Sequence, residues 1–425
     1  MIQVDKIVAR SSFRKHFFRH KPAVISMYVL LVLLLVALLA PIIANEKPLY
    51  VKYHGENYFP AFSLSDVIEL PSGKNEKKEY VPANQVDWIS LHPEKIILAP
   101  IPFSPGKSDV ALRDYIAPSF HRHWLGTTKN GSDVLSGLIH GTRISLSIGI
   151  LSMIIASFIG IVLGSFAGYF GDQHLQITRG GAWMVIPGII AAWFYGFYLR
   201  TNQLSEALTN PGITTLSQPL LCVLIFCFTL FLFYKAGNLL HVIPFFRKKI
   251  NLPADSIVSR SIEVFTSIPR LILIISLAAI ARPSFANLVL IIGLTSWTEI
   301  ARFIRAELLR ARNSGYVESA RTMGFGDVRI ILRHALPNAL APATVAIVFG
   351  VASAILVESG LSFLGIGVPQ DVVTWGSLLF AGKENFQAWW LVVFPGLAIF
   401  VSVTALNLAG DGLRDSLDVR SRIRL

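Results

Sequence analysis

The residues with the clearest potential for chemistry lie in a charged stretch, 316–342, between two apolar segments. Glu318 is expected in the first turn of a short helix, where the helix dipole favours a carboxylate. The small side chains of Ser319 and Ala320 would let another surface approach this helix closely. Gly324 is expected to end it, because glycine often follows a helix C-terminus. Since lipid cannot satisfy these charges, the stretch predicts a docking surface outside the hydrocarbon.

The second half of this stretch predicts a return into the membrane. A further helix is expected over 327–335 and should end at Leu336 and Pro337. Asn338 would then cap the next apolar segment, with Pro342 in its first turn. Connectors between membrane helices are usually short. A helix, a break and another helix therefore favour a platform for a second protein over a plain connector.

Glu358 is the one acidic residue deep in a late apolar segment. At about 1.5 Å per residue, a helix that starts at Pro342 would carry it roughly 24 Å towards the outer face. An ionisable residue inside a membrane span predicts a role in the pathway or in gating. The alternative is an acid near the interface that bonds to Ser359 or to a neighbouring amide. The sequence leaves both readings open.

The sequence does not predict catalysis. Gly126 and Gly131 have the glycine spacing of a phosphate-binding loop, but the lysine that such a loop requires does not follow. The two cysteines, Cys222 and Cys227, share one apolar run and fit neither a redox pair nor a zinc site. No His, Cys and carboxylate cluster has metal-ligand spacing. We therefore expect no enzyme activity, no cofactor and no metal.

The composition indicates a polytopic membrane protein. The chain has 425 residues, is 53% hydrophobic and carries a formal net charge of +12. Its basic residues gather at the ends of apolar runs, which is typical of cytoplasmic loops and argues against nucleic-acid binding. A membrane helix needs roughly 20 apolar residues. We expect eight spans, near 23–44, 144–168, 181–199, 216–236, 263–281, 286–304, 342–364 and 388–409.

The charges of the loops predict the orientation. The loops near 244–260 and 302–333 are basic, whereas those near 200–215 and 365–387 are poor in Lys and Arg. Alternating the loops across the membrane puts every basic loop on one side, which the positive-inside rule makes cytoplasmic. Both termini then lie in the cytoplasm. The first span is longer than the apolar core of a signal peptide, so we expect it to be uncleaved.

This topology divides the chain into parts. Residues 1–45 form a cytoplasmic N-terminus and the first span, and 46–120 form an extracytoplasmic segment that is either a folded cap or a partly ordered loop. The membrane domain covers 140–412 and is interrupted by an inserted helix pair at about 175–250. Residues 413–425 form a cytoplasmic tail. The inserted pair is nearly free of charge and is expected to pack against lipid.

A motif in the charged stretch resembles the coupling loop of ATP-binding-cassette (ABC) importer permeases. In that family the loop contains Glu-Ala-Ala, and Ser replaces the middle alanine here. The family's loop forms a helix that inserts into a cleft on the ATPase subunit. The residues that carry the resemblance are Glu318, Ser319, Ala320, Gly324, Leu336 and Pro337.

Three other stretches, 121–146, 358–369 and 407–420, resemble the C-type subunit of oligopeptide and dipeptide permeases. The resemblance does not extend to 46–120 or to the inserted pair at 181–236. It implies an all-α, type I ABC importer permease in the inner membrane, with six core helices in addition to that pair.

The resemblance also implies partners and a cargo. They are a second homologous permease, two ATP-binding subunits and an extracytoplasmic substrate-binding protein. Peptides are the implied cargo, although close relatives carry nickel chelates or other small solutes. An ion-coupled transporter acting alone would need more ionisable residues at mid-membrane. A membrane scaffold without transport would leave the coupling loop unexplained.

Overall fold

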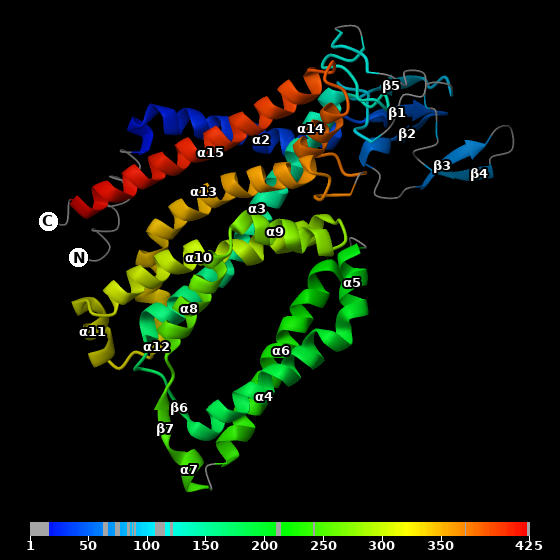
Figure 1. Cartoon of the computed structure of the whole chain (residues 1–425). Helices are drawn as coiled ribbons and strands as arrows, with labels where there is room; N and C mark the ends of the chain where they lie inside the picture. Colours follow the sequence, from blue (N-terminus) through cyan, green and yellow to red (C-terminus); the bar gives the residue numbers. More distant parts are fainter. Residues whose placement is uncertain are drawn as a thin grey trace. The chain divides into compact units, whose positions relative to one another are not determined.

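The computed structural model describes residues 17–62, 67–72, 77–82, 86, 88, 91–106, 115–119, 122–209, 214–240, 243–369 and 371–422. Within these residues, seven helices are long and apolar enough to cross a membrane, and a bent helix pair makes an eighth candidate (Figure 1). The expected polytopic helical architecture is confirmed. The basic residues of the N-terminal head before position 17 lie outside the described residues.

The chain divides into two compact units, which are described separately. The first contains Met1–Ile150 and Val348–Leu425, and the second contains Leu151–Ile347. Two long helices run from one unit into the other. They are α3 (Val134–Phe170) and α13 (Leu336–Phe363).

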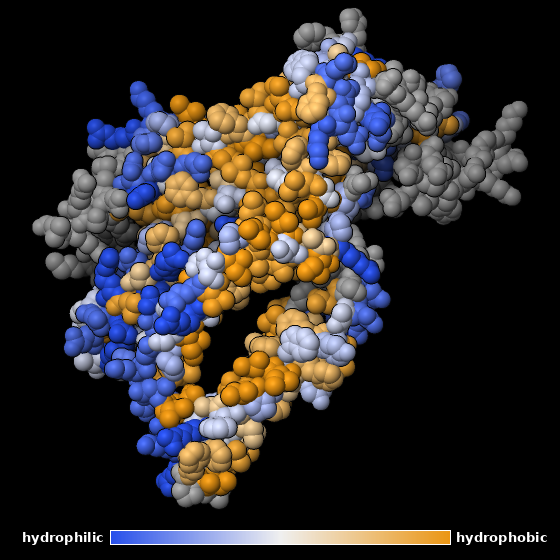
Figure 2. All heavy atoms as spheres, viewed as in Figure 1, coloured by the Kyte–Doolittle hydropathy of each residue, from blue (hydrophilic) through white to orange (hydrophobic). Residues whose placement is uncertain are grey.

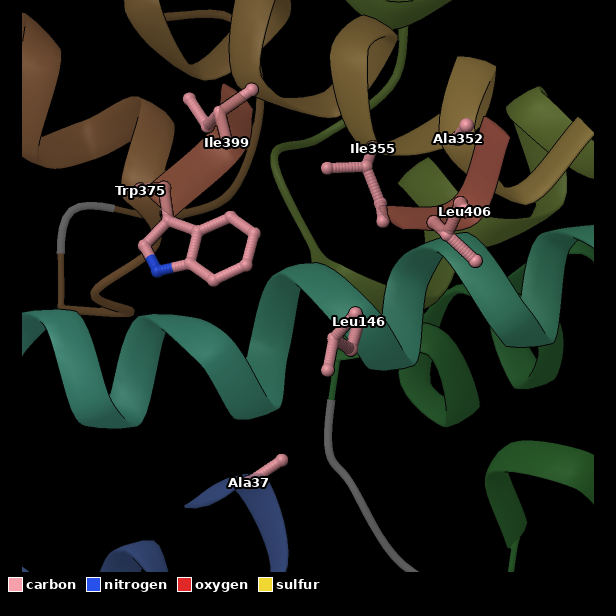
Figure 3. Close-up of a cluster of buried hydrophobic side chains, with 7 residues drawn as sticks. All are labelled: Ala37, Leu146, Ala352, Ile355, Trp375, Ile399 and Leu406. Carbon is pink, nitrogen blue, oxygen red and sulfur yellow. The ribbon is translucent and has the colours of Figure 1, made fainter. Parts of the chain in front are cut away.

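Five helices form the core of the first unit. Three of them lie wholly within it: α2 (Lys21–Ile43), α14 (Trp375–Lys383) and α15 (Trp390–Arg422). These pack with the first part of α3 and the last part of α13. Figure 3 shows a buried apolar cluster to which all five helices contribute side chains, among them the fully buried Trp375. This cluster contains Ala37, Leu146, Ala352, Ile355, Trp375, Ile399 and Leu406.

The C-terminal tail is continuous with the last span up to Arg422. Helix α15 runs unbroken through the expected border at 412–413 and packs along α2. The close approach occurs at Gly412, where an added Cβ would lie 2.2 Å from the Cβ of Ala23. Next to it, the His20 imidazole lies 3.8 Å from the Asp415 carboxylate. The tail therefore forms part of the folded unit.

The segment after the first span contains a small folded part. Strands β1 (Tyr50–Tyr53), β2 (Glu56–Tyr58) and β5 (Lys95–Ile97) form an antiparallel sheet in the order β2-β1-β5. Val51 and Trp88 are buried against this sheet. A second hairpin joins β3 (Val67–Ser72) to β4 (Lys77–Pro82). The described residues of this segment therefore include a small antiparallel sheet with buried side chains of its own.

Close packing of α3 against α10 (Phe285–Ala311) organises the second unit. Gly160, Gly164 and Gly168 recur every four residues on one face of α3. A Cβ added to Gly164 would lie 2.6 Å from the Ala301 carbonyl oxygen. Small residues at this spacing let membrane helices approach until their backbones touch. The sequence carried this pattern, and our sequence analysis did not use it.

We expect the Gly164→Ala variant to lose about 1–3 kcal/mol of stability, because the new methyl group would overlap a backbone oxygen that cannot move freely. Thermal unfolding of the purified protein in detergent measures the loss. Gly396→Ala on α15 is the matched control, since no atom lies within 4 Å of a Cβ added there. An equal change in both variants would contradict the close α3–α10 contact.

The inserted pair forms a helical hairpin. It consists of α4 (Arg179–Gly196) and α6 (Thr214–Leu239), joined through α5 (Thr201–Thr209). Gly180, Gly188 and Gly196 of α4 pack directly on α6. Only 17% of the apolar stretch of the first helix and 11% of that of the second are buried inside the protein, compared with 61% for α10. Figure 2 shows apolar residues along the face of the hairpin in view. This exposure fits the expected packing against lipid.

The fifth predicted span is broken. Helices α8 (Ala254–Ser267) and α9 (Arg270–Ile280) meet at an angle of 81° instead of forming one rod over 263–281. Ile268 is extended, as expected for a residue before proline, and Pro269 has no amide hydrogen to continue a helix. The expected span near 263–281 therefore corresponds to this bent pair, and Pro269 explains the break.

Candidate functional site

The short helix of the charged stretch forms as expected. Helix α11 spans Gly315–Thr322, and Ser314 occupies the N-cap without a side-chain hydrogen bond. Glu318 lies in the first turn and is exposed, as is Ser319. Because the Ser314 side chain does not bond to them, the first amides of α11 still favour a negative charge nearby, such as the Glu318 carboxylate.

Gly324 ends α11 through its backbone conformation. Its φ of +78° lies in the left-handed region, which costs glycine no side-chain clash. The amides of Gly324 and Phe325 donate to the carbonyl oxygens of Arg321 and Ala320, at 2.9 and 3.1 Å. This pair of bonds is a Schellman motif. No atom lies within 4 Å of a Cβ built on Gly324, so conformation and not crowding is what requires glycine.

Ala320 faces the interior of its own unit. It is 2% exposed and packs with Val317, Tyr169 and Ile330. The sequence predicted that the small side chain of Ala320 would let a partner protein approach α11. In the structure this side chain instead faces Tyr169 and Ile330 of the same chain. The small residue instead allows α11 to lie close to the end of α3.

Tyr169, at the end of α3, contacts both α11 and α12. It lies at the end of α3, is 1% exposed, and its hydroxyl donates a hydrogen bond of 2.8 Å to Asp327. The Arg321 guanidinium lies 5.3 Å from the centre of the tyrosine ring, within cation–π range. One side chain thus contacts both helices of the charged stretch. The sequence analysis missed Tyr169, and only its place beside Gly168 at the end of the glycine pattern could have indicated it.

The expected stop at Leu336 and Pro337 is wrong. Helix α12 (Asp327–Ile330) continues through a π-helical turn (Ile331–Ala335) into α13, so that 37 residues from Asp327 to Phe363 form one helical rod. The wider turn accommodates Pro337, which cannot donate to the helix ladder. Asn338 and Pro342 accordingly lie inside the rod and do not cap a new helix.

The outer face of this stretch exposes apolar side chains among its charges. We call residues 315–335 the coupling segment. Met323 is 65% exposed and Val328 is 66% exposed, which is unusual for apolar residues on a polar loop. The exposed large apolar residues of the coupling segment are Tyr316, Met323, Val328 and Leu332.

Glu358 occupies a different place in the fold, inside the first unit. Its carboxylate is fully buried and accepts hydrogen bonds from Ser145 on α3 at 3.0 Å and from Ser362 on α13 at 2.9 Å. Ser359 donates a longer bond of 3.4 Å, and the Thr374 hydroxyl also bonds to the carboxyl group. All of these partners are neutral hydroxyls. The described ion pairs of the chain do not include Glu358.

Glycines make the enclosure of Glu358 possible. A Cβ on Gly376 would lie 2.6 Å from the Ser359 carbonyl oxygen, and one on Gly367 would lie 2.3 Å from the Ser362 hydroxyl. These approaches bring the N-terminus of α14, which Thr374 caps, against α13. Our sequence analysis missed Thr374, because a residue after a loop gives no sign that it meets a carboxyl group sixteen positions earlier.

In the part of the chain that the structure describes, no three His, Cys, Asp or Glu side chains gather as a metal site requires. Cys222 and Cys227 are both free thiols on α6.

Comparisons with known proteins define the class. Residues 242–423 match the model of the binding-protein-dependent transport system inner membrane component family. Residues 10–61 match the N-terminal membrane domain of oligopeptide transport permease C. Together with the helical membrane architecture described above, these two partial matches support a multi-pass inner-membrane permease subunit of an ABC transport system. Over its first span the chain is similar to the oligopeptide transport permease C proteins.

Similar proteins carry names of the same class. The inner membrane ABC transporter permease protein YejE of Escherichia coli K12 is 28% identical over 406 residues, which cover 94% of each chain. A Brucella suis protein whose name assigns it to a peptide transport system as a permease is 41% identical over 170 residues, 40% of this chain and 57% of that one. Another Brucella suis protein, named as a peptide permease, is 29% identical over 328 residues, 76% of this chain and 81% of the relative.

Proposed function

We propose that this chain is the membrane subunit of a peptide importer, in which other subunits hydrolyse ATP and the coupling segment transmits their motion to the membrane helices. The observation that carries this proposal is the coupling segment itself, which combines buried anchors with exposed apolar residues. Its buried side holds it to α3, and its outer side presents Tyr316, Met323, Val328 and Leu332. Such an apolar patch amid charges is suited to a protein partner.

The partners follow from the family. A binding-protein-dependent permease works with ATP-binding subunits and a substrate-binding protein. We propose one second, homologous permease and two ATP-binding subunits per transporter. In this chain the glycines of a phosphate-binding loop lack their lysine, which supports an external source of energy.

The coupling segment is suited to transmitting a rigid-body motion. It continues directly into α13 as one rod, and Tyr169 fixes it to the end of α3. When ATP draws two ATP-binding subunits together, a helix held by one of them would move with it. The attached spans would then tilt and expose the pathway to the opposite side, which is alternating access. Basic loops near 244–260 and 302–333 support a cytoplasmic position for the coupling segment and for both termini.

Peptides are the proposed cargo because two of the relatives carry peptide transport in their names. Nickel chelates and other small solutes are the competing cargoes. Direct binding assays on the substrate-binding protein that works with this chain would separate these cargoes, because the ligand of that protein is the cargo of the system.

Co-purification tests the proposed function. We expect the detergent-solubilised, affinity-tagged chain to bring down ATP-binding subunits in stoichiometric amount. The Met323→Glu and Val328→Glu double variant should lose them, since it puts two charges on the apolar patch. The Phe386→Glu variant serves as a control for an added charge, because Phe386 is 90% exposed and lies in the loop between α14 and α15, outside the coupling segment. Recovery of the intact wild-type chain without ATP-binding subunits would refute the importer proposal.

A further inference from the structure

The inserted hairpin carries a group of cations at the end where it joins the rest of its unit. Arg179 begins α4, and Arg247, Lys248 and Lys249 follow α6 through the short helix α7 (Pro244–Arg247). The Arg179 amide donates to the Lys248 carbonyl oxygen at 2.9 Å, so the two segments lie side by side. Strands β6 (Gln176–Thr178) and β7 (Lys249–Asn251) pair immediately beside them.

Neighbouring acids do not neutralise these cations. Within the described residues, none of the four forms an ion pair with a carboxylate. The nearest acids along the chain are already engaged. Asp172 accepts two hydrogen bonds from Ser256, at 2.9 and 2.7 Å, which lower the pKa of its carboxyl group. Asp255 pairs with Arg305.

An aromatic residue accompanies the cations. The Arg179 guanidinium lies 5.2 Å from the centre of the Phe245 ring, and Phe245 is 56% exposed. Arg247, Lys248 and Lys249 are exposed as well. Exposed aromatic rings beside Lys and Arg, at the ends of apolar helices, are typical of the boundary between hydrocarbon and water. Figure 2 shows hydrophilic residues where the β6–β7 ribbon meets the apolar hairpin.

We propose that Arg179, Arg247, Lys248 and Lys249 form a binding site for the head group of an anionic phospholipid, with Phe245 against its glycerol and upper acyl region. The hairpin exposes apolar side chains to lipid over most of its surface, so an acyl chain can lie along it while the phosphate meets the cations. Basic residues near the cytoplasmic leaflet attract anionic lipids in this way. The hairpin would thus be fixed in the bilayer by lipid, independently of transport.

Lipid titration by native mass spectrometry tests the proposal on the purified full chain. We expect phosphatidylglycerol to bind more tightly than phosphatidylcholine, and each of Arg247→Gln, Lys248→Gln and Lys249→Gln to weaken it by roughly fivefold, since each cation near an anionic surface contributes about that factor. The triple variant should lose the preference for phosphatidylglycerol. Arg260→Gln is the matched control, because this exposed cation already pairs with Glu263 at 2.6 Å.

Two outcomes would overturn the proposal. The first is a triple variant that elutes as a folded monodisperse protein and keeps wild-type affinity for phosphatidylglycerol. The second is displacement of the lipid by soluble glycerol phosphate at equal concentration, which would mean a phosphate site without a lipid. If the triple variant does not fold, the three single variants supply the same comparison. Association with ATP-binding subunits is a separate readout, and its loss would not mimic either result.

Discussion

The Ala320→Leu variant is expected to remain in the membrane and lose at least about tenfold of its ATP-driven uptake. Ala320 lies on the side of α11 that packs against Tyr169 and is only 2% exposed, so a larger side chain has no space there. Overpacking of this kind costs about 1–3 kcal/mol and is relieved by movement of backbone. Helix α11 is short, so it is the element that will move. The exposed side chains of Tyr316 and Met323 would then lose their alignment with the proposed ATP-binding subunit.

Uptake into proteoliposomes, together with ATP hydrolysis in the same preparation, measures this effect. We expect hydrolysis to persist while uptake falls. Ala236→Leu adds the same atoms at an exposed position of α6 and should leave both activities unchanged. Ala320→Gly removes volume and should keep most of the uptake. Wild-type uptake by a correctly inserted Ala320→Leu protein would contradict the proposed role of the coupling segment.

The Glu358→Ala variant is expected to lose about 2–5 kcal/mol of stability. Removal of the carboxylate leaves a cavity and deprives the buried hydroxyls of Ser145 and Ser362 of their acceptor. An unsatisfied buried donor costs about 1–3 kcal/mol. The loss should appear as a lower thermal unfolding midpoint and reduced recovery from the membrane.

The Glu358→Gln variant separates the two readings of this residue. Glutamine keeps an acceptor oxygen, and hydroxyl groups can accept from its amide as well as donate to it. The enclosure by hydroxyls from α3, α13 and the start of α14 favours an anchor that holds these elements together. An anchor predicts near wild-type stability and near wild-type uptake for glutamine. Wild-type stability with abolished uptake would instead indicate that Glu358 changes charge during transport.

Hydropathy and local propensity predicted most of the architecture. Each of the eight expected spans corresponds to a helix or a bent pair, because a bilayer requires long apolar runs with satisfied backbone groups. Helix α11 ended where Gly324 indicated, since a left-handed glycine after a helix is a local effect. The prediction that the helix stops at Pro337 was wrong, because the π-helical turn before it lets the helix continue without a hydrogen bond from the proline nitrogen.

By itself, the sequence determined the class of protein, the approximate positions of the spans and the end of helix α11 at Gly324. These depend on properties of neighbouring residues along the chain. Only the tertiary structure decided that Ala320 faces inwards, that Tyr169 contacts α11 and α12, and that four hydroxyls from three elements surround Glu358. Those facts depend on which helices pack together, through glycine contacts such as Gly164 against Ala301 and Gly376 against Ser359. The hydrogen bonds from Tyr169 to Asp327 and from Ser145 to Glu358 join residues more than a hundred positions apart in the sequence. The residues next to them in the sequence do not indicate which distant residue each one will contact.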